Sequence, residues 1–126
     1  MSTAENALRR AQAPYQPPRI VTDEDVDKCL HFLRDSARTL GDLARQKSEK
    51  ASLVKRTKAL IMQEHSGKSL GAAEREALCD PRYASAETEE AIVIGEYECL
   101  RALRDAAAAK LDCWRTEAAS LRAARL

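Results

Sequence analysis

The chain has few aromatic residues and no long apolar run. Aromatic residues make up 4% of its 126 residues, with one Trp, three Tyr and one Phe. Compact cores usually take much of their buried area from aromatic side chains, so this composition favours helices packed through Ala and Leu. No apolar run reaches the length of a membrane-spanning helix, and no signal-peptide apolar region is present. These absences predict a cytoplasmic protein without membrane contact.

The cysteines and histidines lack the spacing of metal ligands. The four cysteines lie far apart, at Cys29, Cys79, Cys99 and Cys113. Neither His31 nor His65 completes a zinc-ligand pattern with them. Reduced, partly buried thiols are the simplest interpretation, and disulfides or a metal site are the alternatives. We therefore expect no metal and no other cofactor.

The charge of the chain is balanced overall but uneven along its length. Charged residues make up 33% of the sequence, and the net charge is only +1. Residues 1–70 contain 13 Lys+Arg and 9 Asp+Glu, a net charge of +4, whereas residues 71–126 contain 8 and 11, a net charge of −3. The balance excludes a strongly basic protein. It leaves room only for a local nucleic-acid contact in the first part of the chain.

A repeating spacing of three and four between apolar residues predicts a long helix over residues 22–65. Thr22 is a suitable N-cap, and acidic residues follow it in the first turn, where the helix dipole favours negative charge. Such a helix is roughly 66 Å long, which points to a hairpin, a bundle or an oligomer. Its expected apolar seam consists of Val26, Leu30, Leu33, Ala37, Leu40, Ala44, Ala51, Val54 and Ile61.

The second half of the sequence predicts a reversal, a short helix and another long helix. Glycines and serines in residues 66–71 mark the reversal, and residues 72–78 are expected to form the short helix. Asp80 and Pro81 fit the cap and first position of a restart. Ser85 is a second candidate cap, with Glu87, Glu89 and Glu90 in the first turn behind it. The last seam is expected to contain Val93, Tyr97, Leu100, Arg104, Ala107, Leu111, Trp114, Ala118 and Leu121.

The predicted fold is all-α, with two long antiparallel helices joined by a short helical connection and assembled into an oligomer through the two seams. Residues 22–126 form this helical hairpin or bundle domain, and residues 1–21 are expected to form a flexible, proline-containing arm. Residues 4–13 favour a transient helix, which the following prolines stop because proline lacks a backbone donor. The arm is either a disordered leader or a segment that docks on a neighbouring subunit or another partner.

Basic residues cluster at the far end of the first long helix and in the loop after it. We call this cluster the basic stretch: Arg45, Lys47, Lys50, Lys55, Arg56, Lys58 and Lys68. Lys and Arg bind phosphates without reading the base sequence, so the basic stretch is the candidate DNA-binding site. A solvated charged helix face is the alternative. Lys47 and Lys58 fall on the seam, where an unpaired buried charge is costly. We therefore expect the seam to fray after Ala44, with the helix end projecting from the packed body or facing a cavity.

No set of nucleophile, base and acid can be assembled from the sequence. The serines lack the Gly-x-Ser-x-Gly context of a hydrolase. Gly67-Lys68-Ser69 echoes the end of a phosphate-binding loop, but Met62 occupies the position of the upstream glycine and no strand precedes it. We predict that the chain is not an enzyme. A site assembled between subunits is the alternative.

One arrangement of motifs extends over residues 22–126. A long first helix ends in Lys55-Arg56-Thr57-Lys58-Ala59, a Ser66-Gly67 turn and a short helix follow, and the chain breaks at Asp80. The last helix carries Tyr97, Leu100 and Leu111-Asp112. This arrangement resembles the small helical recombination mediator proteins of tailed phages, the UvsY type. That family has Lys-Ala-Arg before the turn and aromatic residues ahead of Ser-Gly. This chain has Lys58-Ala59-Leu60 and Glu64-His65 there, so Lys58 alone is carried over as a DNA contact.

The resemblance implies a non-enzymatic protein that forms ring-like homo-oligomers and binds single-stranded DNA. Such proteins assist the loading of a RecA-like recombinase onto DNA covered by single-strand-binding protein, in the cytoplasm of the bacterial host. The alternative is a helical adaptor or regulatory protein of phage or host origin that binds other proteins and no nucleic acid.

Overall fold

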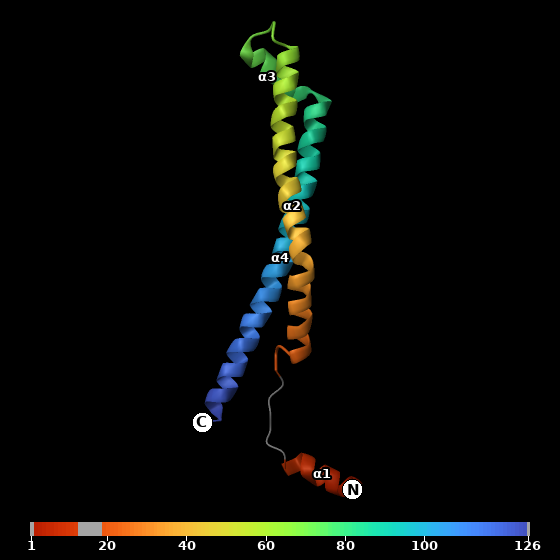
Figure 1. The fold of residues 1–126 in the computed structure, drawn as a ribbon, viewed down its shortest axis with the longest axis vertical. Coiled ribbons are helices and arrows are strands. Elements are labelled where there is room, and N and C mark those ends of the chain that lie inside the picture. The colour runs from red at the N-terminus through yellow and green to blue at the C-terminus, as the bar shows by residue number, and fades with distance from the viewer. Residues whose placement is uncertain (1, 13–18, 126) are drawn as a thin grey trace.

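The computed structural model describes residues 2–12 and 19–125 and consists of four helices. The helices are α1 (Thr3–Gln12), α2 (Asp23–Glu64), α3 (Leu70–Cys79) and α4 (Pro81–Ala124). No strand occurs in these ranges, and α2 and α4 pack side by side along the molecule (Figure 1). The predicted all-α fold of two long antiparallel helices with a short helical connection is confirmed. None of the helices described combines the length and the apolar character needed to cross a membrane.

The N-terminus of α2 is closed by a reciprocal pair of hydrogen bonds. The Thr22 hydroxyl accepts from the Asp25 N–H at 3.1 Å, and the Asp25 carboxylate accepts from the Thr22 N–H at 3.0 Å. The Thr22 N–H thereby lowers the pKa of the Asp25 carboxyl. Val21, just before the cap, is buried, as in helix starts that are fixed by an apolar residue at this position. The predicted cap is confirmed, and the packed body includes residues immediately before it.

The prolines of the predicted arm fall within residues 13–18, outside the described residues. The residues before them form α1, which packs against none of the other three helices. Nearer the hairpin, the Ile20 N–H donates to a carboxylate oxygen of Glu117 in α4 at 3.0 Å. The end of the segment before Thr22 is therefore held on the hairpin by α4.

Two caps separate the short helix from its neighbours. The Ser69 hydroxyl accepts from the Ala72 N–H at 3.3 Å, so α3 begins at Leu70, two residues earlier than expected. The Asp80 carboxylate accepts from the Arg82 N–H at 2.8 Å and caps α4. The expectation of a second cap at Ser85 is wrong, because α4 is continuous from Pro81 onward and Ser85 lies inside it.

The seam predicted for the last helix is confirmed, whereas three of the nine positions predicted for the first helix are wrong. All nine seam residues expected in α4 are buried or half-buried. In α2, Leu30, Ala37 and Ala44 are exposed. The residues just before them, Cys29, Ser36 and Leu43, face α4 instead. The seam of α2 therefore follows positions 26, 29, 33, 36, 40, 43, 47, 50, 54, 57 and 61.

A polar contact explains this change of register. The Arg104 guanidinium donates to the Leu33 carbonyl oxygen at 2.6 Å and to the Ser36 hydroxyl oxygen at 2.7 Å. The Ser36 hydroxyl in turn donates to the Phe32 carbonyl oxygen at 2.6 Å. A part-buried guanidinium without acceptors costs free energy, so the helix pair places Ser36 rather than Ala37 opposite Arg104.

The tightest packing lies at the turn, in the region where we expected the seam to fray. Ile61 is the largest fully buried side chain, with none of its surface exposed. Ala73 and Ala77 of α3 are buried, and their small size lets α3 approach α2 closely. The expectation that the helix end projects from the packed body is therefore wrong. At the opposite end of the hairpin, the C-terminal part of α4 leans away from the start of α2 (Figure 1).

Gly41 lies inside α2 and Gly95 inside α4, and each is open to solvent. A Cβ at either position would meet no atom within 4 Å. We expect Gly41→Ala and Gly95→Ala each to raise the free energy of unfolding by about 0.5–1 kcal/mol, because glycine costs more backbone entropy in a helix than alanine. Chemical denaturation followed by circular dichroism measures this. A loss of stability in either variant would show that a further partner approaches that glycine closely.

Arg82 joins the two sides of the turn. Its guanidinium donates to Glu64 at 2.9 Å and to Asp80 at 3.0 Å, and these hydrogen bonds lower the pKa of both carboxyl groups. A lowered folded-state pKa contributes stability above the ordinary values of 4.5 and 3.8, and that stability is lost as pH falls through the lowered values.

We therefore expect the melting temperature of the wild-type protein to fall more between roughly pH 5 and pH 3 than that of Arg82→Gln. The variant lacks the donor that lowers both pKa values. Thermal melts of the two proteins, followed at 222 nm, provide the comparison. Parallel pH profiles would contradict the role of Arg82.

Candidate nucleic-acid interface

Four of the seven residues of the basic stretch form ion pairs. The Lys50 ammonium lies 2.9 Å from Glu89 of α4, and the Lys58 ammonium lies 3.0 Å from Glu74 of α3. The two others are Lys68–Glu76 at 3.0 Å and Arg45–Glu49 at 2.9 Å. The pairs of Lys50 and Lys58 join α2 to α4 and α3. These two charges therefore help to hold α2 against α4 and α3, as well as adding to the surface potential.

Lys58 is the residue that the resemblance carries over as a DNA contact. It is half-buried, and its hydrogen bond to Glu74 raises the pKa of its ammonium. The charge is therefore held firmly, but an acid already faces it. The pair of Lys68 with Glu76 is similar, and there the ammonium lowers the pKa of the Glu76 carboxyl. A phosphate must compete with a carboxylate at both lysines.

Lys47 lies on the seam, as predicted, and faces an aromatic ring. Its ammonium lies 4.7 Å from the centroid of the Tyr97 ring in α4. An ammonium over the face of a tyrosine is attracted by the negative face of the ring. The charge on the seam is thus stabilised by a contact between the helices, which explains why it does not force the helix end out of the packed body.

Lys55 and Arg56 differ from the rest of the basic stretch. Both are exposed, and neither forms an ion pair within the described ranges. With Arg45, Ser48, Glu49 and Ser52, they line a shallow hollow built entirely from α2 side chains. We call these six residues the outward face, because their positions lie opposite the seam. The structure thus brings three of the seven predicted residues, Arg45, Lys55 and Arg56, together on one exposed surface.

The outward face has a basic neighbour that the sequence analysis missed. Arg38 is exposed and lies seven residues, or two helical turns, before Arg45 on the same side of α2. The heptad spacing was the available signal. The acid Asp42 lies between them, so the face carries mixed charge there and becomes more basic towards Lys55. Glu89, which was assigned to the first turn of a helix, lies inside α4 and instead pairs with Lys50.

Trp114 and Tyr97 have the packing positions predicted for them. The Trp114 indole N–H donates to Asp23 at 3.1 Å and joins the C-terminal half of α4 to the start of α2. Both rings are half-buried on the seam. The outward face therefore contains no aromatic residue on which a base could stack, and any nucleic acid would be held by charge.

The described residues show no metal-binding cluster, since no three His, Cys, Asp or Glu side chains gather in them. The four cysteines are free, and Cys29 is buried. No protein-family model, curated protein or solved structure matches the chain. The geometry of the basic surface is therefore the basis of the functional proposal.

We expect the contact between Lys47 and Tyr97 to stabilise the folded protein. In a double-mutant cycle of Lys47→Met and Tyr97→Leu, we expect a coupling free energy of about 0.5–1 kcal/mol, because each single change removes the same attraction of the ammonium to the ring. Urea denaturation of the four proteins gives this number. A coupling of zero would leave Lys47 available as a nucleic-acid contact.

Proposed function

We propose that the chain is a non-enzymatic protein that binds single-stranded DNA through the outward face of α2. The observation that carries the proposal is the exposure of Lys55 and Arg56, which form no ion pair within the described ranges. Two adjacent free cations suit successive phosphates, which attract Lys and Arg without regard to base sequence. Arg45 extends the surface, because its pair with Glu49 is solvent-exposed and such pairs contribute about 0–1 kcal/mol.

The further role of the protein follows from the resemblance. As in recombination mediators of the UvsY type, DNA binding would assist the loading of a RecA-like recombinase onto DNA covered by single-strand-binding protein. The paired lysines Lys50, Lys58 and Lys68 would then be secondary contacts. A phosphate displaces their acidic partners only where the gain exceeds that of the existing ion pair. The half-buried Lys47 would contribute through the general potential of this end of the hairpin.

The proposal predicts unequal effects from two variants that remove the same charge. We expect Lys55→Gln/Arg56→Gln to weaken binding of a fluorescent oligothymidine by roughly tenfold at low salt and to reduce the salt slope by about 1.4, because two phosphate contacts are lost. Lys58→Gln/Lys68→Gln is the matched control. Its effect should be under about threefold, since each of these ammonium groups already faces a carboxylate. Fluorescence anisotropy over a series of salt concentrations measures both.

Equal losses of DNA affinity in the two variants would rule out the outward face as the binding site. No binding of the wild-type protein at low salt would rule out the DNA-binding proposal itself. For the mediator role, the wild-type protein should shorten the lag before a RecA-like recombinase covers DNA preloaded with single-strand-binding protein. The Lys55→Gln/Arg56→Gln variant should not shorten it.

One observation favours the second candidate, a helical adaptor that binds other proteins. Four of the seven predicted basic residues have acidic partners within the molecule, which reduces the charge left for phosphates. An adaptor would bind its partner with little dependence on salt and with no effect of nuclease. The salt series described above therefore separates the two candidates.

A further inference from the structure

Four arginines surround a hollow at the C-terminal end of α4. The hollow has a volume of about 370 Å³ and lies where α4 leans away from the start of α2 (Figure 1). Its lining residues come from residues 114–125 and, through Arg19, from the segment before α2. All of the charged residues that line it are arginines. We call it the arginine hollow, and its main residues are Arg19, Trp114, Arg115, Leu121, Arg122 and Arg125.

One carboxylate holds two walls of the arginine hollow in place. The same oxygen of Asp23 accepts from the Trp114 indole N–H at 3.1 Å and from the Arg19 guanidinium at 3.5 Å. The indole is half-buried, and the Arg19 side chain keeps 37% of its surface exposed. The ring and one guanidinium are therefore positioned before a ligand arrives, which reduces the ordering cost of binding.

The arginine hollow remains positive when the acids beside it are counted. Asp23 pairs with Arg19, and the Asp112 carboxylate lies 3.7 Å from the Arg115 guanidinium in a solvent-exposed pair. Glu117 lies on the same part of α4 but does not line the hollow, since one of its carboxylate oxygens accepts from the N–H of residue 20. These three acids leave the four arginines with a net charge of +1.

Arg122 and Arg125 carry the positive charge that is not paired. Both are exposed, and neither forms an ion pair within the part of the chain that the structure describes. The helix dipole favours cations in a last turn, so α4 itself accounts for part of this placement. It does not account for Arg19, which precedes α2 and lines the same hollow. An anion in the arginine hollow would therefore meet guanidinium groups from two separate parts of the chain.

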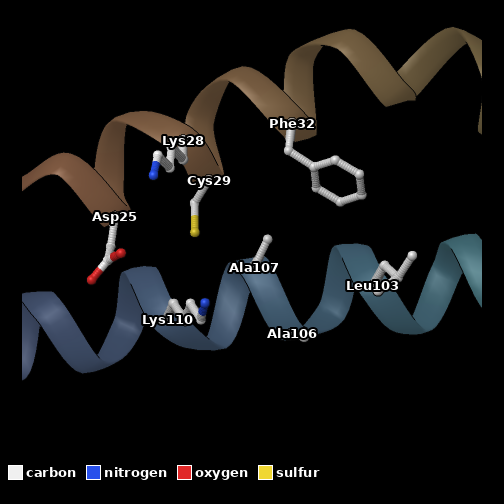
Figure 2. A pocket seen from close by; sticks show the side chains of 8 residues that line it. All are labelled: Asp25, Lys28, Cys29, Phe32, Leu103, Ala106, Ala107 and Lys110. Carbon is white, nitrogen blue, oxygen red and sulfur yellow. The ribbon is translucent and has the colours of Figure 1, made fainter. Parts of the chain in front are cut away.

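The neighbouring hollow between α2 and α4 has a different character. Figure 2 shows Cys29 and Phe32 projecting from α2 towards α4 at this place. The charged residues that line it are Asp25, Lys28 and Lys110. The Lys28 ammonium lies 3.3 Å from Glu24, so the charges of this hollow balance once that acid is included. An anion is therefore drawn to the arginine hollow rather than to this one.

The residues of the arginine hollow suit a phosphate beside a flat ring. Guanidinium groups bind phosphates through paired hydrogen bonds, and aromatic side chains of single-strand-binding proteins stack on bases. Trp114 supplies such a ring next to the arginines, and Leu121 adds apolar surface. The volume of about 370 Å³ falls within the range of about 300–1,000 Å³ for small-ligand sites, so a nucleotide fits. An acidic peptide would pair with the arginines but would leave the ring unused.

We propose that the arginine hollow is a second contact site for single-stranded DNA, which places its phosphates on Arg122 and Arg125 and a base against the Trp114 ring. The inference deepens the proposed function, because it rests on single-stranded DNA as the ligand. It adds the aromatic contact that the outward face lacks. Arg45 of the outward face lies 22 residues, or roughly 33 Å, along α2 from Asp23, so a short strand occupies one site at a time.

Trp114 is the only tryptophan of the chain, so its fluorescence reports on the arginine hollow. We expect pentathymidine to quench this fluorescence at low salt, because a thymine base stacks on the indole. Arg122→Gln/Arg125→Gln should weaken the affinity measured by quenching by at least about tenfold, since two phosphate contacts are lost. Lys55→Gln/Arg56→Gln removes the same charge and should change it by less than about threefold, because these residues lie more than a Debye length away.

Anisotropy of labelled pentathymidine, measured alongside the quenching, separates this site from the outward face. Binding of the wild-type protein without quenching would overturn the arginine hollow and leave the outward face as the site. Equal losses of quenching in the two variants, with helices intact by circular dichroism, would also overturn it. No binding by either measurement would overturn DNA binding itself.

Two competitors test the chemistry of the ligand. An abasic oligomer with the same number of phosphates should displace pentathymidine at least about fivefold less well, because it has no base to stack on the ring. A pentaglutamate peptide should also compete at least about fivefold less well, for the same reason. Equal competition by the abasic oligomer would overturn the stacked base, and equal competition by the peptide would overturn DNA as the ligand.

Discussion

The contact of Arg104 with Leu33 and Ser36 determines how the two long helices face each other. A helix pair joined through alanine and leucine can slide or rotate at little cost, because many such pairings bury similar areas. A guanidinium in the seam removes this freedom, since it needs acceptors where water is displaced. The Leu33 carbonyl and the Ser36 hydroxyl supply them. The other contacts between α2 and α4 follow from this register.

The register divides the basic residues of α2 into two groups. Lys47 and Lys50 face α4, where the Tyr97 ring and the Glu89 carboxylate receive them. Lys55 and Arg56 lie on the far side and stay in solvent. Positive charge along one helix therefore has two physical roles. One group helps to hold the hairpin together, and the other supplies the surface on which the DNA-binding proposal rests.

The same register leaves leucine outside the core. Because Cys29 and Ser36 face α4, Leu30 is exposed on one flank of α2, and Leu53 and Leu60 are exposed on the other. A hairpin of two helices has one seam and cannot bury both flanks by itself. Helices usually bury their apolar stripes against another layer, so a hairpin of this kind gains stability when a further layer covers its open side.

Local chemistry in the sequence determined the elements. Thr22 and Asp80-Pro81 mark helix starts, and a spacing of three and four identified all nine residues predicted for the α4 seam. The sequence did not decide which neighbour faced inward where the choice was between Leu30 and Cys29 or between Ala37 and Ser36. Apolar character favoured the wrong residue in each case. That choice depended on Arg104, which lies about 70 positions away in the chain.

Likewise, the cluster of basic residues was visible in the sequence, but the sequence did not show which acids would pair with it. The carboxylates Glu74 and Glu89, which pair with two of the lysines, come close to them only when α3 and α4 fold against α2. Hydrophobic spacing and caps act within a few residues. The pairing of charges across helices depends on tertiary register and therefore had to come from the structure.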